Sequence, residues 1–307
     1  MNSLLFARCY GQRLAALCLF AGLSFSAQAA PSEPGGSGTL TLTGQVTDAA
    51  THEPLRYASV GVVGTAAGTV TDALGRFRLV VAPQYSHDSL RVALAGYRSF
   101  TASVHDFRQQ ACPSEAPCAV ALAPLPQPAR AADAPGVPQG RTVRRTLGNA
   151  DYAQTVPQPF PGNALGTQVG QRIRVKRRAQ LEEVSFLVER CTYTNAFYRV
   201  NVYQLGADGR PDERRNLMAQ PVYVRLAASA QARRVQLDLR EQGLVLEPGQ
   251  EVAVCLELVH APGPGELQLT NTTATAGPLF EKYSAAGSWT QVSGYGAGIA
   301  ARVAEVR

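Results

Sequence analysis

Basic and apolar residues alternate in one stretch of the 307-residue chain, and this stretch holds its densest group of cations. Arg172, Arg174 and Lys176 are separated there by the apolar Ile173 and Val175. Because side chains of a strand point to alternate faces, the three cations are predicted to share one face. That face could bind an anionic surface ligand such as lipopolysaccharide phosphate. The alternative is a solvated edge strand whose charges prevent aggregation. We refer to this stretch as the basic strand.

Aromatic residues suited to stacking on a sugar ring form a second candidate site. Trp289 is the only tryptophan of the chain, and Tyr283 and Tyr295 lie close to it in the sequence. An exposed ring could act as a platform for a carbohydrate, whereas a buried ring would only fill a core. Trp289 therefore joins the three cations of the basic strand as a candidate ligand-binding residue.

No known pattern of catalytic or metal-binding residues occurs in the sequence. The nucleophile motif Gly-x-Ser-x-Gly is missing, and the Gly-rich segment 293–296 is expected to be a loop. None of the four histidines has a glutamate three residues on, as the His-x-x-Glu pair of a zinc peptidase would require. We therefore predict a non-enzymatic protein with no catalytic residue, no cofactor and no metal ion.

The first thirty residues have the pattern of an export signal. Arg8 and Arg13 precede an apolar run at 14–25, and Ala27-Gln28-Ala29 follows it as a cleavage site. The run is shorter than the ~20 residues that span a bilayer, so we predict a signal peptide at 1–29. The alternative is a buried N-terminal helix. The exported protein would be periplasmic, attached to the outer surface or secreted, without a transmembrane segment.

Removing the signal leaves four of the six cysteines, and an even number in an exported chain indicates disulfides. Sequence distance favours pairing Cys112 with Cys118 and Cys191 with Cys255, out of three possible pairings. A zinc site is the alternative, but the sequence has no CxxC pair to support it. The signal also carries two arginines, so the net charge falls from +6 to +4, too little for a nucleic-acid partner.

Short alternating runs parted by turn residues predict an all-β chain with two domains. A flexible leader at 30–38 precedes a first domain at 39–123, whose seven short strands indicate a β-sandwich. A Pro-rich linker follows at 124–145. Residues 146–307 show about nine or ten further strands and no helical period, so we predict a second, larger antiparallel sandwich of the jelly-roll kind.

Several motifs of the first domain match one family in order and spacing. They are Gly44-Gln-Val-Thr-Asp48, Glu53-Pro54-Leu55, Gly68-Thr-Val-Thr-Asp72, Gly75-x-Phe77-x-Leu79 and Gly96-Tyr97. Residues 39–123 thus resemble the carboxypeptidase-regulatory-like domain, a transthyretin-like sandwich common in exported Bacteroidetes proteins. One departure is His52, where the family usually has a glycine, and a left-handed backbone costs more there. The resemblance implies a fold and no chemistry. Residues 146–307 resemble no family that we recognise.

These observations predict a non-catalytic binding or structural module of the cell envelope. Residues 146–307 would carry any specificity, toward a cell-surface glycan, lipopolysaccharide or another envelope protein. The alternative is a small hydrolase of unrecognised type within 146–307. An enzyme should bring two or more titratable side chains together in a pocket there, whereas a module should show an aromatic or basic patch.

Overall fold

Strands make up most of the computed structural model, which describes residues 38–112, 117–126, 142–150, 155–273 and 277–306. The predicted signal peptide at 1–29 and nearly all of the predicted leader lie outside these residues. Contacts group residues 37–307 into one compact unit. The all-β class predicted from the alternating pattern is confirmed.

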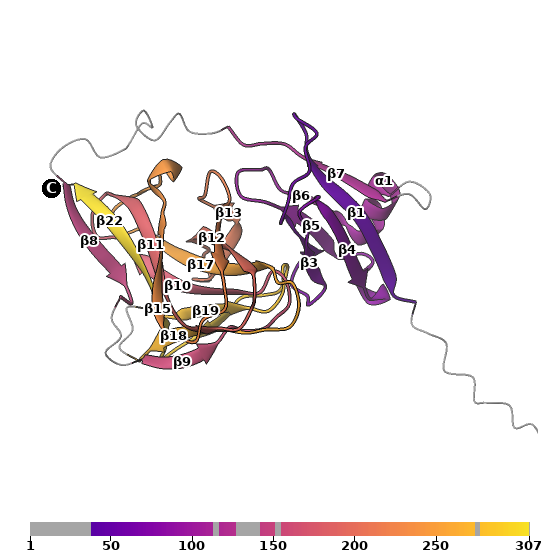
Figure 1. Cartoon of the computed structure of the whole chain (residues 1–307). Helices are drawn as coiled ribbons and strands as arrows, with labels where there is room; N and C mark the ends of the chain where they lie inside the picture. The colour runs from indigo at the N-terminus through magenta and orange to yellow at the C-terminus, as the bar shows by residue number, and fades with distance from the viewer. Residues whose placement is uncertain (1–37, 113–116, 127–141, 151–154, 274–276, 307) are drawn as a thin grey trace, which may run out of the picture. The chain divides into compact units, whose positions relative to one another are not determined.

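Within the described part of the chain, the first sandwich has seven strands, as predicted. One sheet has the order β4-β1-β7 and contains β1 (Leu40–Asp48), β4 (Arg76–Val81) and β7 (Cys118–Leu122). The other has the order β3-β2-β5-β6 and contains β2 (Ser59–Val62), β3 (Gly68–Val70), β5 (Ser89–Ala93) and β6 (Phe100–Ser103). All pairs are antiparallel except β1 with β7 (Figure 1). A 3-10 turn at Pro83–Tyr85 follows β4.

Alternation explains how these strands build a core. In β4, Phe77, Leu79 and Val81 are buried while the residues between them are exposed. Period two therefore places three apolar side chains between the sheets and the arginines in solvent. His52 takes the left-handed conformation that the family's glycine would take, with φ of 61°.

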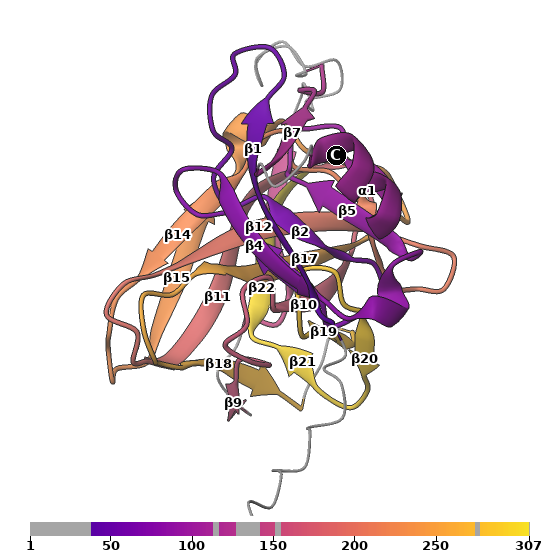
Figure 2. The ribbon, with the colours of Figure 1, turned by 90° about the vertical axis from the view of Figure 1, so that its right-hand side faces the viewer.

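A helix, α1 (Val104–Ala111), follows β6 directly, where only strands were predicted for the first domain. The Ser103 hydroxyl accepts a hydrogen bond from the backbone N–H of Asp106 at 3.0 Å, which caps the helix. Only Val104 and Phe107 are buried, and they pack on the core. The helix lies beside β7 and β5 (Figure 2). The predicted disulfide between Cys112 and Cys118 is present and ties the end of the helix to β7.

The second sandwich has fifteen strands within the described residues, more than the nine or ten predicted. Its seven-stranded sheet contains β10 (Gln168–Arg174), β12 (Ala196–Leu205), β13 (Pro211–Asn216), β14 (Val222–Leu226), β17 (Glu251–His260), β19 (Leu279–Lys282) and β20 (Thr290–Val292). Its eight-stranded sheet contains β8 (Thr142–Gly148), β9 (Thr155–Pro159), β11 (Ala179–Cys191), β15 (Arg233–Asp238), β16 (Val245–Leu246), β18 (Leu267–Thr272), β21 (Gly296–Ala297) and β22 (Ile299–Val306). A 3-10 turn at Arg240–Gln242 precedes β16.

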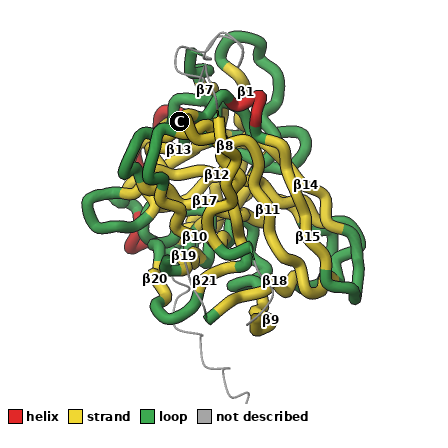
Figure 3. Tube along the Cα trace, turned by 90° about the vertical axis from the view of Figure 1, so that its left-hand side faces the viewer, coloured by secondary structure: helices red, strands yellow, loops and turns green. Residues whose placement is uncertain are grey.

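The core of the second sandwich lies between these two sheets. Val254 and Leu256 of β17 belong to the same buried cluster as Phe186 of β11 and Val303 of β22. β14 and β15 lie on one side of the sandwich, and β9 lies at its lower end (Figure 3). β8 begins at Thr142, inside the range predicted as linker, because it pairs with β22. The remaining linker residues 127–141 lie outside the described residues.

Candidate functional site

Polar side chains cover the outer face of the seven-stranded sheet. Tyr198, Val200 and Val202 of β12 belong to the core, so Arg199 and Asn201 between them point to the opposite face. Apolar strands seldom carry buried charges unless the charges are paired. The first sandwich covers this face, and we call the surface where the two sandwiches meet the junction.

The first ion pair of the junction joins Arg199 to Glu257, its neighbour on β17. Arg199 Nη2 donates to Glu257 Oε2 at 2.7 Å, and the two side chains are 3% and 0% exposed. Arg199 Nη1 also donates to the carbonyl of Tyr57 at 2.6 Å, and Nη2 donates to Ser59 Oγ at 2.8 Å. Ser59 Oγ donates in turn to Glu257 Oε1 at 3.1 Å. The ion pair of the second sandwich therefore also forms hydrogen bonds to Tyr57 and Ser59 of the first sandwich.

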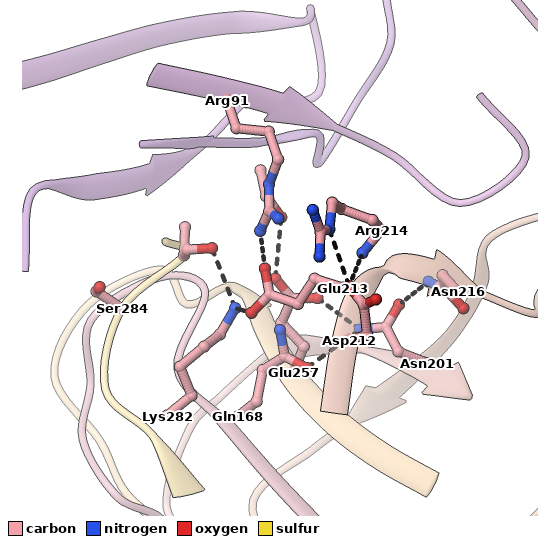
Figure 4. Close-up of polar contacts among 12 residues, drawn as sticks. Arg91, Gln168, Asn201, Asp212, Glu213, Arg214, Asn216, Glu257, Lys282 and Ser284 are labelled. Atoms are coloured by element: carbon pink, nitrogen blue, oxygen red, sulfur yellow. Dashed lines mark hydrogen bonds and ion pairs between the residues drawn. The ribbon is translucent and has the colours of Figure 1, made fainter. Parts of the chain in front are cut away.

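A second group centres on Glu213 of β13. Its carboxylate lies between Arg91 of β5 in the first sandwich and Lys282 of β19 in the second (Figure 4). The distance from Lys282 Nζ to Glu213 Oε1 is 2.5 Å, and Nζ also donates to the carbonyl of Ala285 at 3.1 Å. Burial lowers the pKa of Lys282 to about 7, while the negative charge of Glu257 acts in the opposite direction.

Aromatic and backbone contacts extend the junction beyond the charges. The Tyr57 ring packs on Phe197 and Tyr223, with centroids 6.2 and 5.3 Å apart. The backbone N–H of Gly64 donates to the carbonyl of Ala286 at 2.8 Å. A Cβ atom on Gly96 would lie 2.3 Å from the carbonyl oxygen of Ala219, so only glycine allows this approach.

Two hollows adjoin these ion pairs. An inner cavity of about 60 Å³ is lined by Arg91, Gln168, Arg199, Asn201 and Lys282, among others. An outer hollow of about 390 Å³ is lined from both sandwiches, and we call it the junction cleft. Arg91, Glu213 and Arg214 line both hollows, so the two hollows adjoin at these residues.

Trp289 lines the junction cleft but is no exposed platform, because it is only 9% exposed. Its ring meets the Tyr203 ring edge-on at 6.0 Å, and Lys282 Nζ lies 5.3 Å from its centroid. Its indole Nε1 is buried without a hydrogen-bond partner among the described residues. The nearby Tyr283 and Tyr295 are 54% and 45% exposed.

The side chains of the basic strand point as its alternation predicts, since Ile173 and Val175 are buried. β10 pairs with β17 as far as Arg174 but with β19 only as far as Gln171, so the segment that carries the cations has a paired strand on one side. The Arg172 and Arg174 side chains are 39% and 67% exposed and lie 3.7 and 3.8 Å from Glu251. Lys176 is exposed after the end of β10. None of these three cations lines the cavity or the cleft.

The predicted disulfide between Cys191 and Cys255 is wrong, because both are free and buried. Val254 and Leu256 point into the core, so Cys255 between them points to the outer face, where it packs with Tyr203. Cys191 belongs to the core cluster and lies on the eight-stranded sheet. The seven-stranded sheet therefore separates the two thiols.

The described residues contain no group of three or more histidine, cysteine, aspartate or glutamate side chains placed to bind a metal ion. Within the same part of the chain, no helix combines the length and apolarity needed to cross a membrane.

Sequence reasoning missed the charges of the junction, although a signal was present. Arg199 and Glu257 each interrupt a long apolar strand, and Lys282 is one of few lysines. An isolated charge inside such a run must find a partner when it is buried. The partners themselves could not be predicted, because Arg91 and Glu213 lie far apart in the sequence and meet only through the fold.

Comparison with known proteins finds one family and several distant structures. A structure of the Gx strain of infectious bursal disease virus is 12% identical, with a TM-score of 0.26, over 87% of this chain and 64% of that one. The VP2 subviral particle of the same virus is 12% identical, with a TM-score of 0.23, over 88% and 64%. This chain thus spans less than two thirds of the virus proteins.

A carbohydrate-binding module of the β-sandwich superfamily is 9% identical, with a TM-score of 0.19, over 76% of this chain and 94% of that one. Likenesses at these TM-scores carry no inference about fold or function. No curated protein matches significantly. The family match agrees with the motifs in the sequence and with the strands that they form: residues 42–113 match the model of the CarboxypepD_reg-like domain.

Proposed function

We propose that this chain is an exported, non-catalytic binding module of the cell envelope. Its first sandwich is a CarboxypepD_reg-like domain, whose signature residues are turn formers and core residues. Its second sandwich and the junction supply the polar and aromatic groups that a ligand needs. Export rests on the signal pattern at 1–29, which lies outside the described residues.

The observation that carries this proposal is that both carboxylates at the centre of the junction are held by cations. Glu257 accepts from Arg199 and Asn201, and Glu213 accepts from Arg91 and Lys282. A general acid or base must exchange a proton with a substrate, which a carboxylate enclosed in ion pairs does poorly. These groups therefore support a structural role that shapes an adjoining binding surface.

A small hydrolase remains the second candidate, because titratable side chains do converge in this structure. Arg91, Arg199 and Lys282 line one cavity together with Glu213. Convergence of this kind is what an active site would show. The ion pairs favour the binding role, and a direct assay separates the two.

The test uses the mature chain, residues 30–307, with cell-envelope fractions and a glycan and lipopolysaccharide array. The binding role predicts retention on a defined glycan or envelope component, with no release of sugar, acyl or peptide products. Turnover that is lost in Glu213→Gln, whose carboxylate lines the cavity, would establish the hydrolase instead. Amino-terminal sequencing of the exported protein should find Ala30 or Pro31 first, and an intact Met1 would contradict export by cleavage.

A further inference from the structure

The junction cleft joins walls from the two sandwiches around one space. Val63 and Thr101 line it from the first sandwich, and Asp212, Arg214 and Trp289 line it from the second. Its volume of about 390 Å³ lies at the low end of the ~300–1,000 Å³ range of small-molecule sites. Such sites occur preferentially between domains.

The cleft combines apolar and polar surface. Val63 is 44% exposed, and Trp289, which is 9% exposed, adds a small part of its ring. The hydroxyls of Ser89, Thr101 and Ser288 are also in the lining. A ligand that fits must therefore offer both C–H surface and many hydroxyl or amide groups.

The charges of the cleft balance one another. Two guanidinium groups, of Arg91 and Arg214, face two carboxylates, of Asp212 and Glu213. Burial acts to raise the pKa of Asp212, but hydrogen bonds from Arg215 and Arg214 lower it below its usual range. The carboxylate is therefore ionised near neutral pH and can accept from a ligand hydroxyl. A balanced lining gives no net attraction for an anion, which sets the cleft apart from the basic strand.

We propose that the junction cleft binds a neutral saccharide of one or two rings. Val63, the exposed apolar side chain of the lining, would contact the C–H surface of a ring, while Asp212 and Arg214 would hydrogen-bond to its hydroxyls. Charged planar groups suit this task, because they form strong hydrogen bonds of fixed direction with neutral partners. The inference rests on the proposed binding role and differs from the earlier expectation that residues 146–307 suffice, since the first sandwich forms one wall.

The test blocks the cleft from the first sandwich without touching a core residue. Thr101 is exposed on β6 and lines the cleft, so Thr101→Phe should fill part of it. Thr43 is exposed on β1 and does not line the cleft, so Thr43→Phe is the matched control. Isothermal titration of residues 30–307 would use glucose, galactose, N-acetylglucosamine, lactose, cellobiose and chitobiose.

At least one saccharide should bind the intact chain and shift the emission of Trp289, the only tryptophan. Thr101→Phe and Asp212→Asn should each weaken that binding at least tenfold, and Thr43→Phe should change it less than twofold. Saccharide binding that survives Thr101→Phe, or that is lost only when the basic strand is substituted, would overturn the cleft and leave the binding role intact. If the chain is retained on envelope fractions but no saccharide gives a heat of binding in the titration, the saccharide ligand is wrong and the proposed binding role still stands.

Discussion

Lys282 places a cation in the interior of the protein, since its side chain is 1% exposed. Arg91 and Arg199 add two more positive charges around it, and Glu213 and Glu257 add two negative ones. The group therefore carries one excess positive charge when Lys282 is protonated and none when it is neutral. Removing one partner of a buried pair leaves an uncompensated charge, at a cost of ~3–5 kcal/mol.

The lowered pKa of Lys282 predicts how stability changes with pH. Its folded pKa of about 7 lies below the lysine pKa of ~10.4 in an unfolded chain. Between these values the unfolded chain binds more protons, so the contribution of Lys282 to the free energy of unfolding rises with pH. Glu213→Gln removes the nearest carboxylate, which should lower the folded pKa of Lys282 further. The rise of the free energy of unfolding with pH should then begin at lower pH. Because the substitution also leaves a buried cation without its partner, the free energy of unfolding at pH 7 should fall by about 3 kcal/mol.

Urea unfolding of the unsubstituted chain and of Glu213→Gln, at several pH values from 6 to 9, measures how the free energy of unfolding changes with pH. The control is Glu266→Gln, which removes the exposed partner of Arg190 and should cost less than about 1 kcal/mol. A Glu213→Gln curve parallel to that of the unsubstituted chain would contradict the buried pair.

The four described cysteines should fall into two chemical classes. Non-reducing peptide mapping after unfolding should find Cys112 linked to Cys118, and alkylation should label only Cys191 and Cys255. Replacing Cys112 and Cys118 by serine opens a loop with a sequence separation of 6, which the chain-entropy model values at about 2 kcal/mol. A mapped link between Cys191 and Cys255 would show that the separation by the seven-stranded sheet is wrong.

At the scale of elements, strands with clean alternation were predictable and short or mixed elements were not. β1 and β4 follow from period two, because every second residue, such as Leu42 in β1 and Phe77 and Leu79 in β4, faces one core. α1 is only eight residues long with two buried residues, too weak a period to read from sequence. The two-residue strands β16 and β21 form only because a neighbouring strand pairs with them.

The basic strand offers a prediction about an element that is charged but not required for folding. Arg174→Ser with Lys176→Ser should change the free energy of unfolding by less than about 0.5 kcal/mol, because both side chains are exposed. The two substitutions should weaken any binding of an anionic glycan. In the unsubstituted chain, the affinity for such a glycan should fall as the salt concentration rises through ~0.15 M, where charges more than about 8 Å apart are screened. Thermal unfolding and titration at two salt concentrations measure both. A large loss of stability would mean that these residues hold the fold together.

At the scale of the whole molecule, the sequence predicts two sandwiches but says nothing of how they meet. The domain boundaries at 39–123, 124–145 and 146–307 stay a prediction. The junction depends on contacts between distant residues, such as Tyr57 with Phe197 and Ser59 with Glu257. Buried ion pairs and ring contacts of this kind indicate sandwiches that bind each other directly, so that the linker need not hold them together.

Cleavage of the linker tests this claim most directly. A specific protease site placed between residues 130 and 135 would be cut in the folded chain, and the products would be passed over a size-exclusion column. Salt screens buried ion pairs only weakly. The two fragments should therefore elute together at ionic strengths of both about 0.05 M and about 0.5 M. Glu213→Gln should make them separate more readily, while Glu266→Gln should not. Two folded fragments that elute apart at low salt would contradict the junction and the cleft that it forms.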